Sequence, residues 1–201
     1  ILDSRNPGEY AQGHLRGSIN IGLGGNYASW SGTVLDYNKQ IVIVATPGRE
    51  VEAATRLSRI GYDKVAGFLK DGPGAFSQAT DAVVKLERVP ANQLAASLKS
   101  AQPPLVLDVR TDAEWKDKHI DGAIHIPLSH LLERITEVPN DRRLVIHCLG
   151  GYRSAIAASI LASHGIDNLS AMVGGINAWL EASLPVVRAR DAASSTSCAA
   201  N

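Results

Sequence analysis

The chain has 201 residues, a length that fits one large domain or two small ones. Its 20 basic and 20 acidic residues give a formal net charge of 20 − 20 = 0, so it lacks the basic surplus of a nucleic-acid-binding surface. Hydrophobic residues make up 45% of the chain, which is enough for a core. The longest apolar runs fall far short of the roughly 18 residues that span a bilayer. We therefore expect a globular protein without nucleic-acid or membrane partners.

The sequence predicts alternating strands and helices. The chain opens on apolar residues that resemble the middle of a strand, and a second apolar strand covers residues 41–44. A glycine-containing loop and a helix follow, and Gly61 ends that helix. In the second half, strands are expected over Leu105–Val109 and Leu144–His147, with a short polar helix between them and a longer helix after them. This alternation predicts an α/β fold, with a parallel sheet flanked by helices in each half.

The two halves repeat one plan. Residues 2–23 and 107–128 are identical at nine of 22 positions when the chain is shifted by 105. Residues 41–63 align with residues 144–167 after one residue is removed from the loop of the second copy. The second copy also has a lead-in that the first copy lacks, so we expect the missing part of the first domain to lie upstream of Ile1.

These patterns predict two domains and a tail. We expect the first domain over residues 1–80, truncated at its amino end, then a linker over 81–85 and the second domain over 86–187. Residues 188–201 lack hydrophobic periodicity, which favours a flexible tail.

The numbers and spacing of the cysteines and histidines limit which disulfide bonds and metal sites are possible. Two cysteines, Cys148 and Cys198, are too few for a disulfide framework, which favours a reducing, cytoplasmic setting. The six histidines show no spacing typical of metal ligands, and we expect neither a metal nor another cofactor.

The segment HCLGGYRS, residues 147–154, joins the second strand to the long helix of the second half. Such a junction directs backbone N–H groups and the positive end of a helix dipole at the loop. Cys148 lies there, so the helix end and the cation of Arg153 would stabilise its thiolate, and we expect a reachable, reactive sulfur. Gly150 and Gly151 permit positive φ and leave room for several amides to turn inward as an anion cradle.

Three spaced blocks, LDVR…EW…HI.GAIHIPL, HCLGGYRS and VGGINAWLEASLPV, resemble the rhodanese (sulfurtransferase) family over nearly all of residues 86–187. The resemblance implies two rhodanese-like domains and a loop cysteine that carries a sulfane sulfur as a persulfide. On this basis Cys148 would be the sulfur carrier, Arg153 would orient the anion, and Ser154 would cap or open the helix. The residues that would form the substrate site are Leu149, Gly150, Gly151, Tyr152 and Ser154.

The first half resembles the same fold without the nucleophile, because Ala45 occupies the place of Cys148 and the loop is one residue shorter. Arg49 keeps the place of Arg153, and we expect it to serve the structure or an interface. His147 should point to the opposite face of its strand from Cys148 and also serve the structure. Four residues of the second half recur in the first and are best explained by the fold: Asp108, Arg110, Glu114 and His119 recur as Asp3, Arg5, Glu9 and His14.

We therefore expect an enzyme, a rhodanese-type sulfurtransferase, that moves sulfane sulfur from a persulfide or thiosulfate to a thiol, sulfite or cyanide. The order of the two domains, an inactive copy before an active one, also resembles the C-terminal part of proteins that fuse a metallo-β-lactamase-like persulfide dioxygenase to rhodanese domains. The resemblance implies such a domain upstream as a further partner. One alternative is a non-catalytic or redox-sensing binding module, in which Cys198 could be the resolving thiol. Another is a phosphatase or arsenate reductase, which the short loop disfavours because four residues, not five, separate Cys148 from Arg153.

Overall fold

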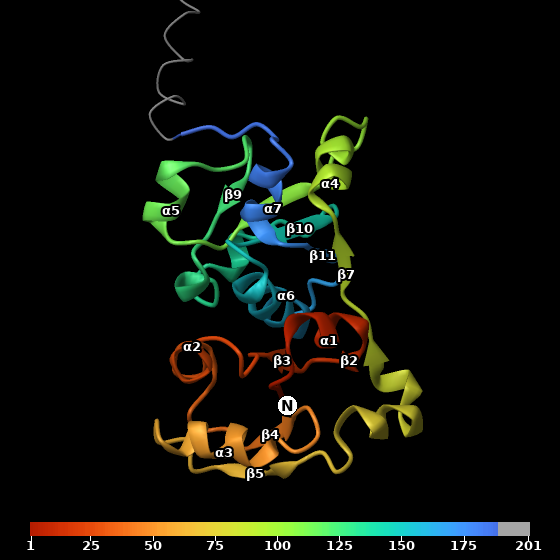
Figure 1. Ribbon diagram of the computed structural model, residues 1–201, viewed down its shortest axis with the longest axis vertical. Coiled ribbons are helices and arrows are strands. Elements are labelled where there is room, and N and C mark those ends of the chain that lie inside the picture. The colour runs from red at the N-terminus through yellow and green to blue at the C-terminus, as the bar shows by residue number, and fades with distance from the viewer. Residues whose placement is uncertain (189–201) are drawn as a thin grey trace, which may run out of the picture. The chain divides into compact units, whose positions relative to one another are not determined.

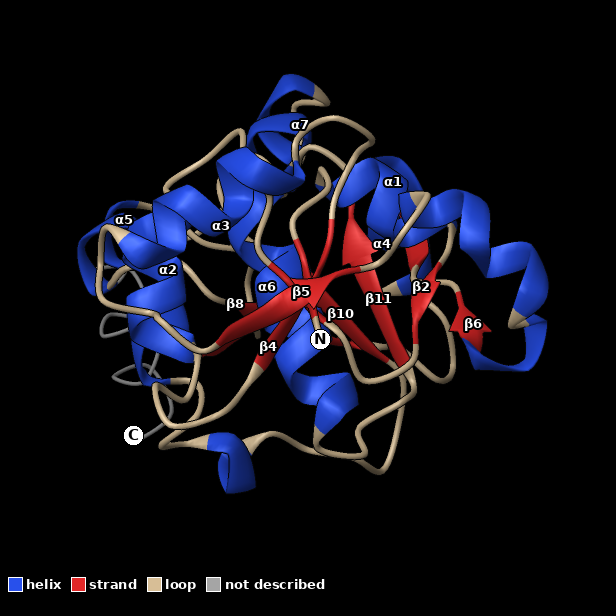
Figure 2. Ribbon diagram, turned by 90° about the horizontal axis from the view of Figure 1, so that it is seen from below, coloured by secondary structure: helices blue, strands red, loops and turns tan. Residues whose placement is uncertain are grey.

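The computed structural model describes residues 1–188, so Cys198 and the expected tail beyond Arg188 lie outside the described part. The chain divides into two compact units. The first unit consists of Ile1–Glu87 and Ala158–Asp167, and the second consists of Arg88–Ala157 and the described residues from Asn168 on. Each unit holds a sheet with helices around it (Figures 1 and 2), which confirms the predicted α/β fold. Within the described residues, no helix is both long and apolar enough to cross a bilayer.

The first unit is built on a four-stranded parallel sheet in the order β3-β1-β4-β5. These strands are β1 (Leu2–Asp3), β3 (Ile19–Asn20), β4 (Ile41–Val44) and β5 (Val65–Phe68). The helices are α1 (Pro7–Gln12), α2 (Tyr27–Val34) and α3 (Glu50–Ser58), followed by the 3-10 helices η1 (Gly72–Gln78) and η2 (Thr80–Ala82). A separate antiparallel pair joins β2 (His14–Leu15) to β6 (Val83–Val84), which lies inside the stretch expected as a linker.

The second unit holds a five-stranded sheet in the order β7-β11-β10-β8-β9, whose last four strands run parallel. The strands are β7 (Glu87–Val89), β8 (Leu105–Asp108), β9 (Ile124–His125), β10 (Leu144–His147) and β11 (Leu169–Met172). The α-helices are α4 (Ala91–Ser97), α5 (Asp112–Asp117), α6 (Tyr152–Ser163), whose residues from Ala158 on are counted with the first unit, and α7 (Gly175–Glu181). Two short 3-10 helices, η3 (Leu128–His130) and η4 (Ile135–Glu137), precede β10.

Local sequence rules explain why the elements of the two units begin where they do. Both α1 and α5 start with a capping box, in which the side chains of Asn6 and Thr111 accept a hydrogen bond from the N3 amide, and the carboxylates of Glu9 and Glu114 accept one from the cap amide. All four residues of β10 are buried, as expected for a central parallel strand covered on both faces.

Two buried ion pairs explain part of the repeat. Asp108 and Arg110 approach to 2.5 Å, and the guanidinium also donates to the carbonyl of Lys118. Asp3 and Arg5 repeat this pair at 2.5 Å, with Gly13 as the carbonyl acceptor. In each unit the arginine ties the end of a strand to the chain just after the following helix, which supports the interpretation that these shared residues serve the fold.

One face of the sheet differs between the units. In the second unit Val106 and Val145 are 3% and 1% exposed and pack in a core cluster with Leu94 of α4. Their counterparts Ile1 and Val42 are 50% and 40% exposed. The described elements of the first unit include no helix equivalent to α4.

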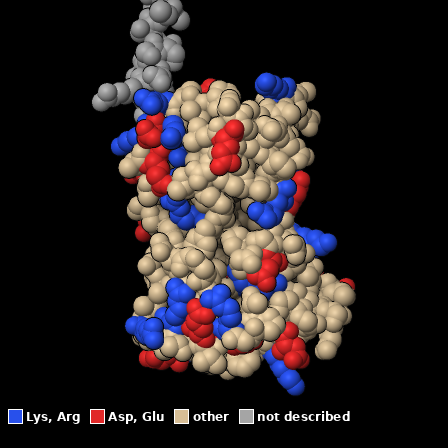
Figure 3. Space-filling view, viewed as in Figure 1, with Lys and Arg blue, Asp and Glu red and all other residues tan. Residues whose placement is uncertain are grey.

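Charged side chains of both signs alternate over the surface shown in Figure 3, where Lys and Arg lie next to Asp and Glu. Surface ion pairs such as Arg134 with Glu137 and Arg49 with Glu52, each at 2.7 Å, contribute to this mixing. On the described part of the drawn face there is consequently no extended field of one sign.

Candidate functional site

Cys148 follows β10 directly and precedes the loop that leads into α6. The backbone N–H of Gly151 donates to its Sγ atom at 3.1 Å. The thiol in turn donates to Oγ of Ser154 at 3.7 Å, and that hydroxyl donates to the carbonyl of Gly151. The sulfur is therefore enclosed by one amide and one hydroxyl of its own loop and helix.

The start of α7 fixes the backbone on the other side of the loop. The N–H groups of Ile176 and Asn177 donate to the carbonyls of Cys148 and Leu149 at 2.8 and 3.1 Å. Gly175 makes this approach possible, because it adopts a φ of +57° and a Cβ atom there would lie 2.4 Å from the Cys148 carbonyl oxygen. The two carbonyls thus point at α7, away from the interior of the loop.

The loop itself combines exposed and constrained residues. Gly151 adopts a φ of +106°, whereas Gly150 does not take a positive φ, so only one of the two glycines uses the expected freedom. Leu149 is 44% exposed and Gly150 is also exposed. Within the described residues the N–H groups of Leu149 and Gly150 have no hydrogen-bond acceptor, so they remain available to an anion.

Arg153 forms a bidentate ion pair with Glu114, with both N–O distances at 2.7 Å. The pair is partly buried, with the arginine side chain 18% and the glutamate side chain 28% exposed. The hydrogen bonds from Arg153, and to a lesser degree those from Thr111, lower the pKa of Glu114 to about 2 despite its partial burial. Glu114 thus neutralises the charge of Arg153, the cation that we expected beside Cys148.

His147 is fully buried, and burial is the largest cause of its lowered pKa, so the ring is neutral at pH 7. Its Nδ1 atom lies 3.3 Å from the carbonyl oxygen of Cys148. The side chain therefore contacts the backbone of the cysteine, which agrees with the structural role expected for it.

The first unit contains the same loop architecture without the thiol. Ala45 is buried at the end of β4, and a Cβ atom on Gly72 would lie 2.8 Å from its carbonyl oxygen. Gly72 has a φ of +50° and thus corresponds to Gly175. Arg49, by contrast, pairs with Glu52 on its own helix instead of with an equivalent of Glu114. The first unit therefore keeps the anchoring of the loop but neither its nucleophile nor its ion pair.

Two expectations from the sequence need correction. Cys148 is only 1% exposed, so its sulfur is not directly reachable in this conformation, because the loop backbone, Gly151 and Ser154 enclose it. Ser154 does not cap or open the helix, since α6 already begins at Tyr152 and the buried hydroxyl bonds within the first turn.

Two residues near the site were missed by sequence reasoning. Glu114 was assigned to the fold alone because it recurs as Glu9, yet it also holds Arg153. Gly175 lies inside the block VGGINAWLEASLPV, but its close approach to Cys148 joins residues 27 positions apart. The pair of consecutive glycines at Gly174 and Gly175 was the available signal, because both adopt positive φ.

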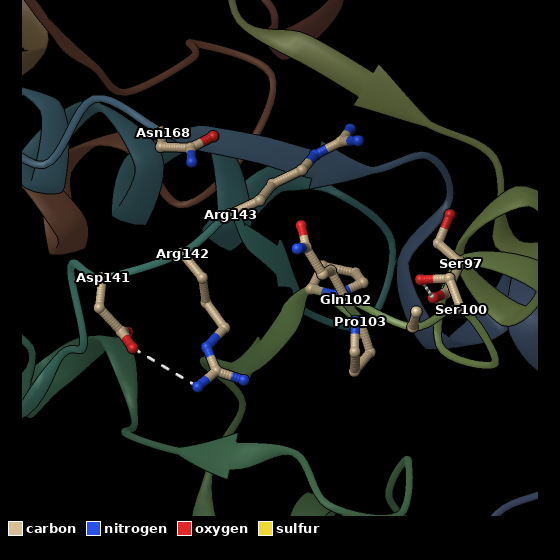
Figure 4. Close-up of a pocket in the computed structure, with 10 residues that line it drawn as sticks. Ser97, Ser100, Gln102, Pro103, Asp141, Arg142, Arg143 and Asn168 are labelled. Carbon is tan, nitrogen blue, oxygen red and sulfur yellow. Dashed lines mark hydrogen bonds and ion pairs between the residues drawn. The ribbon is translucent and has the colours of Figure 1, made fainter.

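A separate pocket of about 730 Å³ lies in the second unit, at the amino ends of β8, β10 and β11 (Figure 4). Figure 4 shows Arg142 turned toward Asp141, to which it is bound at 3.4 Å, and Arg143 extending from the start of β10. Cys148 follows the opposite, carboxyl end of β10, so this pocket is not part of the cysteine site.

Comparisons with known proteins agree with these features. A family model described as "Rhodanese-like domain" matches residues 1–79 and 90–182. The chain is 32% identical to "Sulfurtransferase" of Allochromatium vinosum over 102 residues, which are 51% of this chain and 95% of that protein. It is 34% identical to "Thiosulfate sulfurtransferase GlpE" of Shewanella oneidensis over 91 residues, 45% of this chain and 89% of that one. A rhodanese-related protein of Thermoplasma volcanium has a similar crystal structure, with 34% identity, a TM-score of 0.47 and coverage of 50% of this chain and 97% of that chain.

Proposed function

Because the chain belongs to the rhodanese-like family, we propose that it is a sulfurtransferase in which Cys148 of the second unit carries the sulfur. The relatives named sulfurtransferase support this class of activity in general. The observation that carries the specific proposal is the hydrogen bond from the Gly151 amide to Sγ, because it places a backbone N–H donor at the atom that would carry the transferred sulfur.

The proposed reaction has two steps. The Cys148 thiolate attacks the outer sulfur of a donor such as a persulfide or thiosulfate; a new S–S bond forms, the donor's own S–S or S–S(O₃) bond breaks, and the electron pair leaves with the thiolate or sulfite. A thiol, sulfite or cyanide then attacks the outer sulfur of the cysteine persulfide and regenerates the thiolate. Each step is a nucleophilic displacement at the transferred sulfur, in which the leaving group takes the electron pair of the broken bond, so neither step requires an oxidant.

The loop would stabilise the anions in both steps. The Gly151 amide already contacts Sγ, and the available amides of Leu149 and Gly150 are suited to hold the added sulfur. The hydroxyl of Ser154 would hold the thiol. Tyr152 and Arg153, the first two residues of α6, would form the end of the loop. Since Sγ is enclosed, the donor would enter only after the exposed side of the loop, at Leu149 and Gly150, moves.

Intact-mass measurement after incubation with a persulfide or thiosulfate tests the proposal. We expect one added sulfur on the wild-type protein, mapped to Cys148 by peptide analysis, and none on Cys148→Ser. Release of that sulfur to cyanide as thiocyanate would complete the cycle. Sulfur found on Cys198 alone would contradict the proposal.

The low exposure of Cys148 favours one second candidate, a non-catalytic or redox-sensing module. In that case an oxidant would link Cys148 to Cys198, and no thiocyanate would form with any donor. The mass and turnover measurements above separate the two functions in a single series of samples.

A further inference from the structure

The ion pair between Glu114 and Arg153 determines the charge that a donor meets at the cysteine loop. Within residues 148–154, Arg153 is the single charged side chain. Both of its terminal nitrogens bind the Glu114 carboxylate at 2.7 Å. Because that carboxylate remains ionised at neutral pH, the charges of the pair sum to zero, and a second anion at Arg153 would have to approach Glu114 as well.

This arrangement disfavours a doubly charged donor. Two like charges repel more strongly near a protein surface than in bulk water, because the effective dielectric constant is lower there. A dianion such as thiosulfate would meet this repulsion without an unpaired cation of the loop to offset it. Leu149, 44% exposed beside the cysteine, instead offers apolar contact to an organic group.

Resting on the proposed function, we infer that the donor is an organic persulfide, R–S–SH, and that Glu114 is the specificity residue that disfavours thiosulfate. The Cys148 thiolate attacks the outer sulfur of R–S–SH, the S–S bond of the donor breaks, and the products are Cys148–S–SH and the thiolate R–S⁻. Glu114 touches neither the donor nor Sγ; it acts by occupying Arg153.

The chain contains a matched control for this residue. Glu9 closes the capping box of α1 as Glu114 closes that of α5, with N–O distances to the cap amide of 3.3 and 3.0 Å. Glu9 has no arginine partner equivalent to Arg153, because Arg49 binds Glu52. Comparing Glu114→Gln with Glu9→Gln therefore separates the ion pair from helix capping, since glutamine can serve in a capping box.

The experiment measures the rate of sulfur loading on Cys148 from the persulfide of 2-mercaptoethanol, which carries no carboxylate, and from thiosulfate. We expect wild-type protein to load faster from the persulfide, and Glu114→Gln to raise the thiosulfate rate relative to the persulfide rate by about tenfold. Glu9→Gln should leave the ratio of the two rates unchanged. Inorganic sulfate should compete with loading of Glu114→Gln but not of wild-type protein.

The outcomes distinguish this inference from the proposed function. A wild-type protein that prefers thiosulfate would overturn the inference, and this measurement does not depend on the folding of any variant. If the ratio of the thiosulfate rate to the persulfide rate is equal in wild-type protein and in a folded Glu114→Gln, the inference is also overturned. The proposed sulfurtransferase function would not be affected by that result. Absence of loading from both donors in every protein would refute the proposed function itself.

Discussion

Replacement of Gly175 by alanine tests how the cysteine loop is held. The new Cβ atom would lie 2.4 Å from the carbonyl oxygen of Cys148 and 2.5 Å from that of Leu149. Both are backbone atoms, so no side-chain rotation relieves the overlap. The start of α7 must move away, and the hydrogen bonds from Ile176 and Asn177 to these two carbonyls must lengthen or break.

The magnitude follows from two contributions. A residue with a Cβ atom at a φ of +57° costs about 1–2 kcal/mol. Loss of the two hydrogen bonds costs about 0.5–1.5 kcal/mol each. Together they predict a destabilisation of the second unit by about 2–5 kcal/mol. Gly165→Ala is the control for backbone strain alone, because Gly165 has a φ of +82° and no atom within 4 Å of an added Cβ, so it should cost only about 1–2 kcal/mol.

Urea unfolding and sulfur loading provide the assay. Gly175→Ala should lower the free energy of unfolding more than Gly165→Ala does, and it should abolish most loading of Cys148. Gly72→Ala, whose Cβ would meet the Ala45 carbonyl at 2.8 Å, should destabilise the first unit and preserve loading. The reasoning would be refuted if Gly175→Ala were no less stable than Gly165→Ala and loaded sulfur at the wild-type rate.

Three further predictions follow from the paired units. The ion pair lowers the pKa of Glu114 to about 2, so the stabilisation by this pair is present above the ordinary pKa of 4.5 and is lost as the pH falls toward 2. In urea titrations, the free energy of unfolding of wild-type protein should therefore fall between pH 4.5 and 2. Glu114→Gln should show a smaller fall over this window, whereas Glu9→Gln should show the wild-type fall. Val145→Ala should lower the free energy of unfolding by about 2 kcal/mol, and Val42→Ala by less than about 0.5 kcal/mol, because only the former residue is buried; equal losses would contradict this. In a Cys148→Ser background, Ala45→Cys should gain no sulfur by intact mass, because the shorter first loop lacks the geometry that holds it.

The sequence predicts the fold and the position of the cysteine well, because both depend on local patterns. The strand at 144–147 and the loop after it follow from a run of apolar residues and from glycine. The repeat then identifies both sheets at once, and the family match confirms two rhodanese-like domains. Burial of Val145, by contrast, depends on packing against Leu94 of α4, a helix that lies outside the aligned stretches.

The details of the site could not be predicted in the same way, because they depend on contacts between distant residues. Arg153 meets Glu114 across 39 positions of the chain, and the recurrence of Glu9 suggested that the glutamate serves only the fold. Gly175 approaches Cys148 across 27 positions. The thiol is enclosed by the Gly151 amide and the Ser154 hydroxyl, an arrangement that no period of two or 3.6 residues encodes.

The two units together separate what the fold requires from what the chemistry requires. Each has two consecutive residues with positive φ at the start of the helix that follows β5 or β11, Asp71 and Gly72 at +63° and +50°, and Gly174 and Gly175 at +69° and +57°. In both, the second residue of the pair is a glycine that lies against the carbonyl of the first loop residue. Anchoring of the loop is therefore a property of the fold and persists where no thiol is present. What the second unit adds is a cysteine, one more loop residue and an ion pair that joins Arg153 to Glu114 of the preceding helix, so these three features are where the activity and its specificity should be sought.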